Sequence, residues 1–386
     1  MTRATTRLSA VALLAAAPAA LHAQGQPEGA VNETLGNEVI DETAPAVGPS
    51  FSLDVSGQVD IGLMLTEDGD RTDLFVVDND SSSTRLTIVG TSEWQSGAEL
   101  GFRLQGELQL NGSNVVSQDD KDDVPEPLIN DRIWEVFAGS PRFGLLAIGQ
   151  GSTASDGVSE IDLSGTGVVG YSSTADLGAG LRLRSDGALT DTPLGSAFSN
   201  FDGLGREARI RYDTPEFGGA TLAFSVTDQD SHDVALTFER GLGEGSANAV
   251  TLAGGIAWSE SEDDIELING SLSILHDRTG LNATIAAARR EGVDGASDPE
   301  LGYIKLGWRS DDLVGLGGTA FSIDYARNDD VGADGSEGDA VGVQAVQTVD
   351  RLNMELFAGY RRFDVDRADA DFEDVDVFTL GGRYQF

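Results

Sequence analysis

Few residues in this sequence belong to the types that carry out covalent chemistry. The chain has no cysteine and three histidines, so thiol catalysis and thiolate-bound metals are excluded. Two of the histidines, His232 and His276, stand near predicted turns. The run 230–233 (DSHD) contains the residue types of a hydrolase triad, but neighbours in one loop do not place a histidine between an acid and a nucleophile. We therefore expect no enzymatic activity and no catalytic residues.

Charged side chains are abundant and suit a different chemistry, the electrostatic attraction and orientation of solutes. Asp and Glu number 65 against 25 Lys and Arg, which gives a formal net charge of −40 at pH 7. This charge argues against a nucleic-acid partner and favours cations near the protein. Acids cluster in the stretches 119–123, 262–264 and 364–374. Clustered carboxylates can bind Ca²⁺, but none of these has EF-hand spacing, so we expect solvated loops and no cofactor, with loop-bound Ca²⁺ as the alternative.

The elements that must position these charges are β-strands. Apolar residues or glycines occupy every second position over 53–65, 100–110 and 352–360, and only a strand places alternate side chains on opposite faces. A strand that crosses a membrane obliquely needs roughly 9–11 residues. Similar segments predict sixteen strands: 51–65, 83–91, 98–110, 131–138, 143–149, 206–213, 219–227, 233–240, 248–259, 267–275, 281–289, 301–309, 318–327, 340–349, 351–362 and 375–386. The alternation is ambiguous within 131–149, so the sequence predicts two strands there without assigning which side chains face the lumen and which face the lipid.

The connections between the predicted strands alternate between short turns and longer acidic loops, of which 151–205 is the longest. This alternation is typical of bacterial outer-membrane barrels. An open sheet of sixteen strands would leave two unpaired edges, whereas sixteen strands closed into a barrel leave an aqueous channel inside. We therefore predict an all-β, sixteen-stranded antiparallel transmembrane barrel, with a soluble β-sandwich or β-solenoid as the alternative.

The N-terminus predicts export. Residues 1–23 combine two arginines, a short apolar run and a small-x-small site before Gln24, which is the pattern of a signal peptide. Residues 24–50 are polar and acidic, and we expect a disordered periplasmic lead-in there. The barrel domain then spans 51–386. Together these features predict the outer membrane of a Gram-negative bacterium.

The last strand carries a further signal. Phe378, Leu380, Tyr384 and the terminal Phe386 fall on one face. An alternating last strand that ends in Phe resembles the C-terminal signature by which the barrel-insertion machinery recognises outer-membrane proteins. We assign that role to Tyr384 and Phe386.

Three segments carry a resemblance to one family. Residues 83–100 (STRLTIVGTSE, then GAEL), 211–217 (RYDTPEF) and 382–386 (GRYQF) are similar to the second and third strands, a strand-turn segment and the terminus of the Gram-negative general porins. They span the start, middle and end of 51–386. The resemblance implies a sixteen-stranded barrel, usually trimeric, with its long third loop folded into the lumen. The acidic lead-in and the extreme negative charge depart from the family pattern.

The resemblance also implies where a constriction would form. In the third loop, 151–205, it places Asp156, Glu160 and Asp162 where the family has its constriction carboxylates. The period-two phase puts a set of arginines on the lumen side of the wall, with Arg132 in uncertain phase. The predicted constriction arginines are Arg85, Arg103, Arg132, Arg209 and Arg211, and the predicted lumen-wall arginines are Arg361 and Arg383.

The expected function is a water-filled channel for passive diffusion of small hydrophilic solutes and ions. A transverse field between the loop acids and the wall arginines would orient polar solutes, and the net charge predicts a preference for cations. The alternative is a structural or adhesive outer-membrane barrel with no open pore. Expected partners are outer-membrane lipid, lipopolysaccharide (including bridging through divalent cations) and two further copies of the chain in a homotrimer.

Overall fold

The computed structural model describes residues 49–386 apart from 123, 125, 126, 244, 293–296, 312 and 369. The predicted signal peptide and nearly all of the predicted lead-in lie outside the described residues. So do Asp123 and Asp369 of two acidic stretches. Within the described ranges, no helix is both long enough and apolar enough to cross a bilayer.

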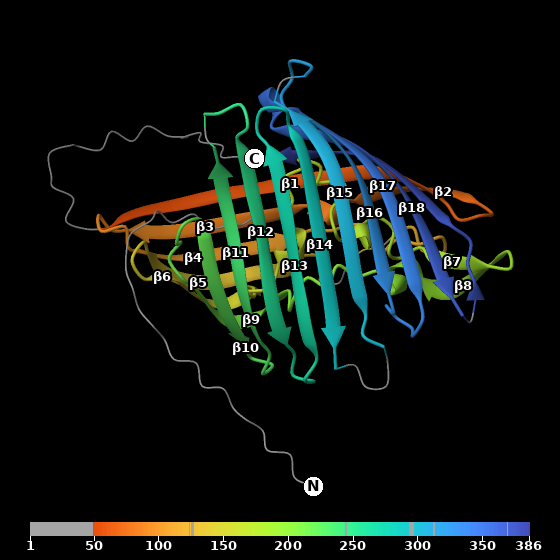
Figure 1. The fold of residues 1–386 in the computed structure, drawn as a ribbon, viewed down its shortest axis with the longest axis horizontal. Helices are drawn as coiled ribbons and strands as arrows, with labels where there is room; N and C mark the ends of the chain where they lie inside the picture. The colour runs from red at the N-terminus through yellow and green to blue at the C-terminus, as the bar shows by residue number, and fades with distance from the viewer. Residues whose placement is uncertain are drawn as a thin grey trace, which may run out of the picture.

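Sixteen antiparallel strands form one closed barrel (Figure 1), as predicted. The ring closes where Gln58 to Glu67 of the first strand pair with Gln385 to Asp376 of the last. Every predicted strand has a counterpart, with bounds that differ by a few residues. The strands are β1 (Ser50–Glu67), β3 (Arg85–Glu93), β4 (Glu99–Glu107), β5 (Asn130–Ser140), β6 (Gly144–Ser152), β9 (Arg206–Asp213), β10 (Ala220–Thr227), β11 (His232–Leu242), β12 (Val250–Glu260), β13 (Glu266–His276), β14 (Leu281–Glu291), β15 (Glu300–Ser310), β16 (Thr319–Asp329), β17 (Glu337–Val349), β18 (Met354–Arg367) and β20 (Val375–Gln385).

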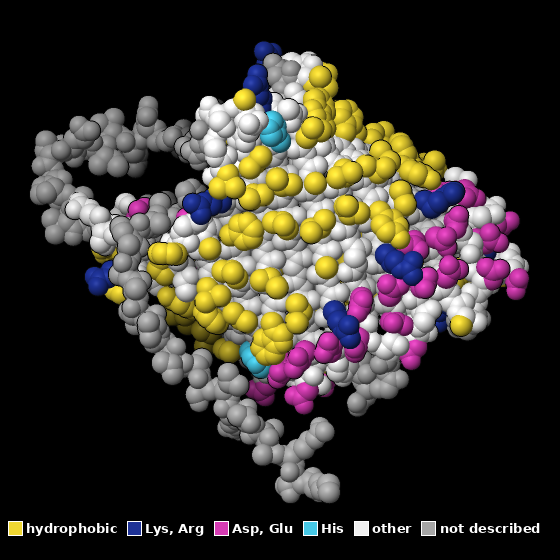
Figure 2. Space-filling model, in the orientation of Figure 1, with side chains coloured by type: hydrophobic (Ala, Val, Ile, Leu, Met, Phe, Trp, Pro, Cys, Tyr) yellow, Lys and Arg dark blue, Asp and Glu magenta, His cyan; other side chains and the backbone are white. Residues whose placement is uncertain are grey.

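The two faces of the sheet differ as the period-two pattern predicts. On β16, Phe321, Ile323 and Tyr325 are exposed, whereas Ser322 and Asp324 are buried. The exposed set defines the outer face and the other set the inner face. Figure 2 shows hydrophobic side chains in rows across the strands and acidic side chains gathered along one rim. That arrangement is the apolar band of a membrane barrel with a polar edge on its loop side.

Tryptophans mark both ends of the apolar band. Trp94 follows β3 and Trp308 lies near the end of β15, both at the ends with short turns. Trp258 lies near the opposite end of β12, next to a longer loop, and Trp134 lies in the middle of β5. Aromatic residues at both membrane interfaces are typical of such barrels.

The structure shows which side chains of β5 and β6 lie on the outer and inner faces of the barrel. Trp134, Val136 and Ile148 are exposed on the outer face, while Glu135 is buried on the inner face. The register shifts between β4 and β5, so that Gln105 pairs with residue 133 and Gly106 with residue 131. Residue 132 is left unpaired in a β-bulge, which breaks the alternation and explains why the sequence phase was ambiguous there.

Several short elements lie outside the predicted set. β2 (Thr72–Asp78) pairs with the end of β1, although 66–82 was predicted as a loop; a short 3-10 turn at Asp80–Ser82 separates it from β3. β7 (Arg182–Ser185) and β8 (Ala188–Pro193) form a hairpin inside the longest connection. Its turn is Asp186-Gly187, both with positive φ, which is a preferred two-residue hairpin turn. β19 (Ala370–Asp371) pairs antiparallel with the end of β18.

Candidate functional site

The longest connection joins β6 to β9, and we refer to residues 153–205 as the long segment. It follows the inner face of the strands that come after β10 in the ring. Its backbone amides and hydroxyls bond to serine side chains on β10, β13 and β16. The bonds are Ala154 N to Ser225 Oγ at 2.8 Å, Ile161 N to Ser271 Oγ at 3.1 Å, Leu163 N to Ser273 Oγ at 3.0 Å, and Thr166 Oγ1 with Ser322 Oγ at 2.7 Å.

Apolar contacts hold the middle of the long segment against the wall. Val169, Leu177 and Leu181 belong to one buried hydrophobic cluster with Phe357 and Val377 of β18 and β20. Burying a side chain of this size contributes about 1.5–3 kcal/mol. The segment is therefore packed against the wall as a core element is, rather than extended into solvent.

Asp162, a predicted constriction acid, lies in an ion pair at this wall. Its Oδ2 is 2.6 Å from Lys305 Nζ of β15, and it accepts hydrogen bonds from Ser164 N at 2.7 Å and Thr284 Oγ1 at 3.1 Å. Burial alone would raise the pKa of Asp162, but the Lys305 ammonium and the hydrogen bonds outweigh burial and hold it below its usual value. Lys305 was not predicted as part of the site. Its position among the inward-facing residues of the predicted strand 301–309 could have indicated it.

The other two predicted acids, Asp156 and Glu160, belong to a group that closes the base of the long segment. Asp202 accepts hydrogen bonds from Gly157 N at 2.8 Å and Ser159 Oγ at 2.9 Å, so it ties the end of the segment to its beginning. Asp156 lies 3.9 Å from Arg206. Asp202 was not predicted, because nothing local distinguishes it from other loop acids.

Burial and mutual repulsion raise the pKa values of these loop acids. Burial, followed by the charges of Asp202 and Asp156, raises the pKa of Glu160 well above its usual value. Burial and then Asp156 raise the pKa of Asp202 to about 7. Burial and then Asp80 raise the pKa of Asp176 to about 7. Asp202 and Asp176 therefore gain charge through the neutral pH range.

Two of the predicted arginines support the base of the long segment. Arg209 is buried and donates to Glu135 Oε2 at 2.5 Å and to Ser152 O at 2.9 Å. Arg211 donates to Thr153 O at 2.7 Å and pairs with Asp213 at 2.9 Å. Both guanidiniums are thus committed to carbonyls and carboxylates where the segment leaves β6.

Three predicted arginines lie on the inner face of β3–β5, half of the ring away from β13–β15. Arg85 is half-buried. Arg103 lies 3.4 Å from Glu135. Arg132, in its bulge, lies 2.6 Å from Glu107 and donates to Gln105 on the inner face of β4, which fixes its direction. The structure places these three on neighbouring strands, across the barrel from β13–β15.

The predicted lumen-wall arginines also lie on the inner face. Arg361 of β18 makes a two-fold contact with Asp324 of β16, at 2.7 and 3.0 Å, and both side chains are buried. Arg383 of β20 pairs with Glu355 and donates to Ser82 Oγ at 2.6 Å. Each wall arginine thus has a carboxylate beside it.

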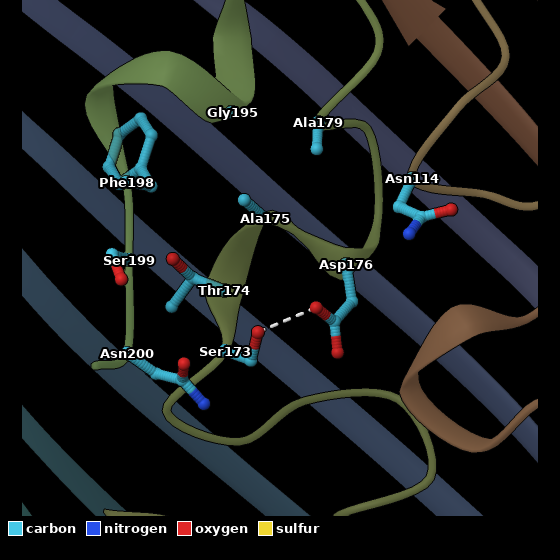
Figure 3. Close-up of a pocket in the computed structure, with 10 residues that line it drawn as sticks. All are labelled: Asn114, Ser173, Thr174, Ala175, Asp176, Ala179, Gly195, Phe198, Ser199 and Asn200. Carbon is cyan, nitrogen blue, oxygen red and sulfur yellow. Dashed lines mark hydrogen bonds between the residues drawn. The ribbon is translucent and has the colours of Figure 1, made fainter. Parts of the chain in front are cut away.

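Two turns of the long segment, together with Asn114, line an open pocket of about 240 Å³. Ser173, Thr174 and Asp176 line one side, and Phe198 and Asn200 line the other (Figure 3). The Ser173 hydroxyl donates to Asp176 at 2.5 Å. The lining is mostly polar, so water can occupy it.

The remaining candidate groups do not assemble. Among the described residues, no three His, Asp or Glu side chains stand together as a metal site would need. Asp233 points inward and accepts from Ser155 N at 2.8 Å, whereas His232, on the alternate phase of β11, packs edge-on against Trp258. Neighbouring residues of a strand face opposite sides, so the 230–233 run does not form a triad.

The sequence and the fold both match known proteins. A family model described as Gram-negative porin matches residues 10–386. No curated protein sequence matches the chain. Among solved structures, the anion-selective porin from Comamonas acidovorans is 17% identical, with 87% of this chain and 100% of that chain covered and a TM-score of 0.60. The trimer form of OmpT, an outer-membrane protein of Vibrio cholerae, is 13% identical, with 87% and 100% covered and a TM-score of 0.54. At such identities the likeness shows the fold alone.

Proposed function

Because this chain belongs to the Gram-negative porin family, we propose that it forms a water-filled channel through the outer membrane for passive diffusion of small hydrophilic solutes and ions. The observation that carries the proposal is the closed ring with charged and hydroxyl side chains on its inner face. Sixteen strands enclose more space than side chains alone fill. Passive diffusion through such a channel needs no reactive group.

We propose that the long segment lies in the lumen and narrows it. Its contacts with the inner face of β10, β13 and β16 support this placement. The opening would then lie between the loop acids and the arginines of β3–β5, that is Arg85, Arg103 and Arg132. A solute there would cross a transverse field, which orients dipoles and penalises apolar molecules.

We also propose a preference for cations. The wall arginines stand next to carboxylates, so they add little net positive charge. The 151–205 connection itself carries seven acids and two arginines. A pore lined by excess negative charge concentrates cations. The anion selectivity named for the Comamonas porin belongs to that protein, because selectivity depends on side chains that fold similarity does not fix.

Three observations support the proposed partners, which are further copies of the chain, the insertion machinery and lipopolysaccharide. A solved trimer among the similar structures supports a homotrimer. Tyr384 and Phe386 are exposed on the outer face of β20, as recognition by the insertion machinery would require. Exposed acids such as Glu291 and Glu337 at the loop rim suit contact with lipopolysaccharide through divalent cations, the setting in which loop-bound Ca²⁺ would act.

The cation preference should rise with pH. Asp176 and Asp202, each with a pKa of about 7, are mostly neutral at pH 5 and mostly charged at pH 9. The reversal potential of the channel in a KCl gradient should therefore shift toward the K⁺ equilibrium potential between these pH values. A reversal potential that does not change, or that moves toward Cl⁻ at high pH, would contradict the assignment of these acids to the pore.

A further inference from the structure

The use of lysine in this chain is unusual. Of its 25 basic residues only two, Lys121 and Lys305, are lysines. Lys121 lies in the loop before β5, with its side chain 43% exposed beside Asp73. Lys305 is in the middle of β15 and has no exposed surface. A buried lysine needs partners that satisfy its charge and its donors.

Both partners of Lys305 belong to the long segment. Its Nζ lies 2.6 Å from Asp162 Oδ2 and 2.5 Å from the Gly170 carbonyl oxygen. One ammonium group therefore holds two points of the segment that are eight residues apart in the sequence. A compact ammonium has donors that diverge in direction, whereas a planar guanidinium would direct them into one plane.

The groups around this contact close the same junction. Asp162 accepts from both the backbone and the hydroxyl of Ser164, at 2.7 and 2.8 Å. Two residues further on, Thr166 bonds to Ser322 of β16 at 2.7 Å. Arg309 of β15 also donates to the Leu163 carbonyl oxygen, at 3.3 Å, but Lys305 and Asp162 form the buried ion pair of this junction. Loss of one partner of a buried ion pair destabilises far more than loss of a neutral hydrogen bond.

We propose that Lys305 is the positioning residue of the constriction. It anchors residues 162–170 to β15 and thereby sets the width and the steadiness of the opening on that side. Asp162 neutralises the Lys305 ammonium, so the electric field that acts on solutes comes from the other loop acids. This inference rests on the proposed channel function, but the anchor can be tested without any channel current.

Amine labelling of Lys305 is the first test. In a Lys121→Met background, Lys305 is the only lysine, so a small water-soluble acylating reagent followed by peptide mass spectrometry reports on that one side chain. Asp162→Asn should speed labelling of Lys305 by roughly a hundredfold or more, because labelling follows local opening and the variant strands a buried charge. Heat-modifiable migration on gels shows that the barrel is folded. Equal labelling rates in the two folded proteins would overturn the anchor.

Channel recording is the second test. Lys305→Met should close at lower voltage and fluctuate between several conductance levels, while the matched Lys121→Met should behave as the parent does. The chain has no cysteine, so Thr166→Cys with Ser322→Cys can re-attach the segment; oxidation should restore one steady level in Lys305→Met, and reduction should remove it. Steady parental currents from folded Lys305→Met would overturn the positioning role. If the parent itself does not conduct, the channel proposal fails and the labelling result alone decides the anchor.

Discussion

Ile304→Lys should destabilise the barrel by about 2–4 kcal/mol, whereas Ser310→Lys on the same strand should cost about 0–1 kcal/mol. Both positions are on the outer face of β15. Ile304 is near the middle of this eleven-residue strand and is 46% exposed, so a lysine there would face the lipid at its deepest level. Ser310 ends the strand at the turn side, where a lysine can reach water.

Urea titration of folding into phosphatidylcholine vesicles measures both costs. Lys305 follows Ile304 in the sequence but points to the inner face, where Asp162 pairs with its ammonium. The strand therefore accepts a lysine whose charge has a partner. Equal costs for the two variants would mean that the exposed face of β15 does not meet a membrane, which would contradict the transmembrane barrel.

The second large effect concerns ion selectivity. The triple variant Glu160→Gln, Asp176→Asn and Asp202→Asn should lose most of the cation preference of the parent at pH 9, where the raised pKa values no longer keep Asp176 and Asp202 neutral. A unit charge about 4 Å from a passing ion is worth about 1 kcal/mol in bulk water, or about a fivefold change in local cation concentration. The reversal potential in a KCl gradient measures the loss.

A matched control removes three carboxylates elsewhere. Asp70→Asn, Asp119→Asn and Asp191→Asn change the same number of charges at side chains that are 66%, 56% and 102% exposed. Asp70 and Asp119 lie in loops of the wall, and Asp191 lies on the exposed β7–β8 hairpin, away from Glu160, Asp176 and Asp202. This control should keep the parental selectivity at pH 9. Equal losses in both triple variants would place the selectivity in the overall surface charge rather than in Glu160, Asp176 and Asp202.

The fold could be predicted from the sequence because the period of two is a local property. The sixteen strands and the outward phase of Phe378 and Leu380 follow from it directly. The β2 segment, 72–78, has a continuous apolar run at 74–77 instead of this alternation, and it was assigned to a loop. The bulge at Arg132 could not be read, because one inserted residue reverses the phase and depends on the partner strand.

The candidate site was harder to predict from the sequence than the fold was. The pattern put Arg103 and Arg361 on the inner face, where they lie, but the constriction role of Arg103 and the lumen-wall role of Arg361 remain predictions. The pairing of Asp162 with Lys305 joins residues 143 positions apart, and the tie from Asp202 to Gly157 joins residues 45 apart. Contacts of that range depend on the path of the long segment, which no periodicity encodes.

Single-channel recording of the purified protein in a planar lipid bilayer tests the central claim most directly. The proposed channel should give stable, ohmic current steps in KCl, and the proposed cation preference should put the reversal potential on the cation side in a salt gradient at neutral or higher pH. Folded protein that inserts into the bilayer and carries no current would contradict a water-filled pore, and would instead favour a structural or adhesive barrel whose lumen the long segment closes.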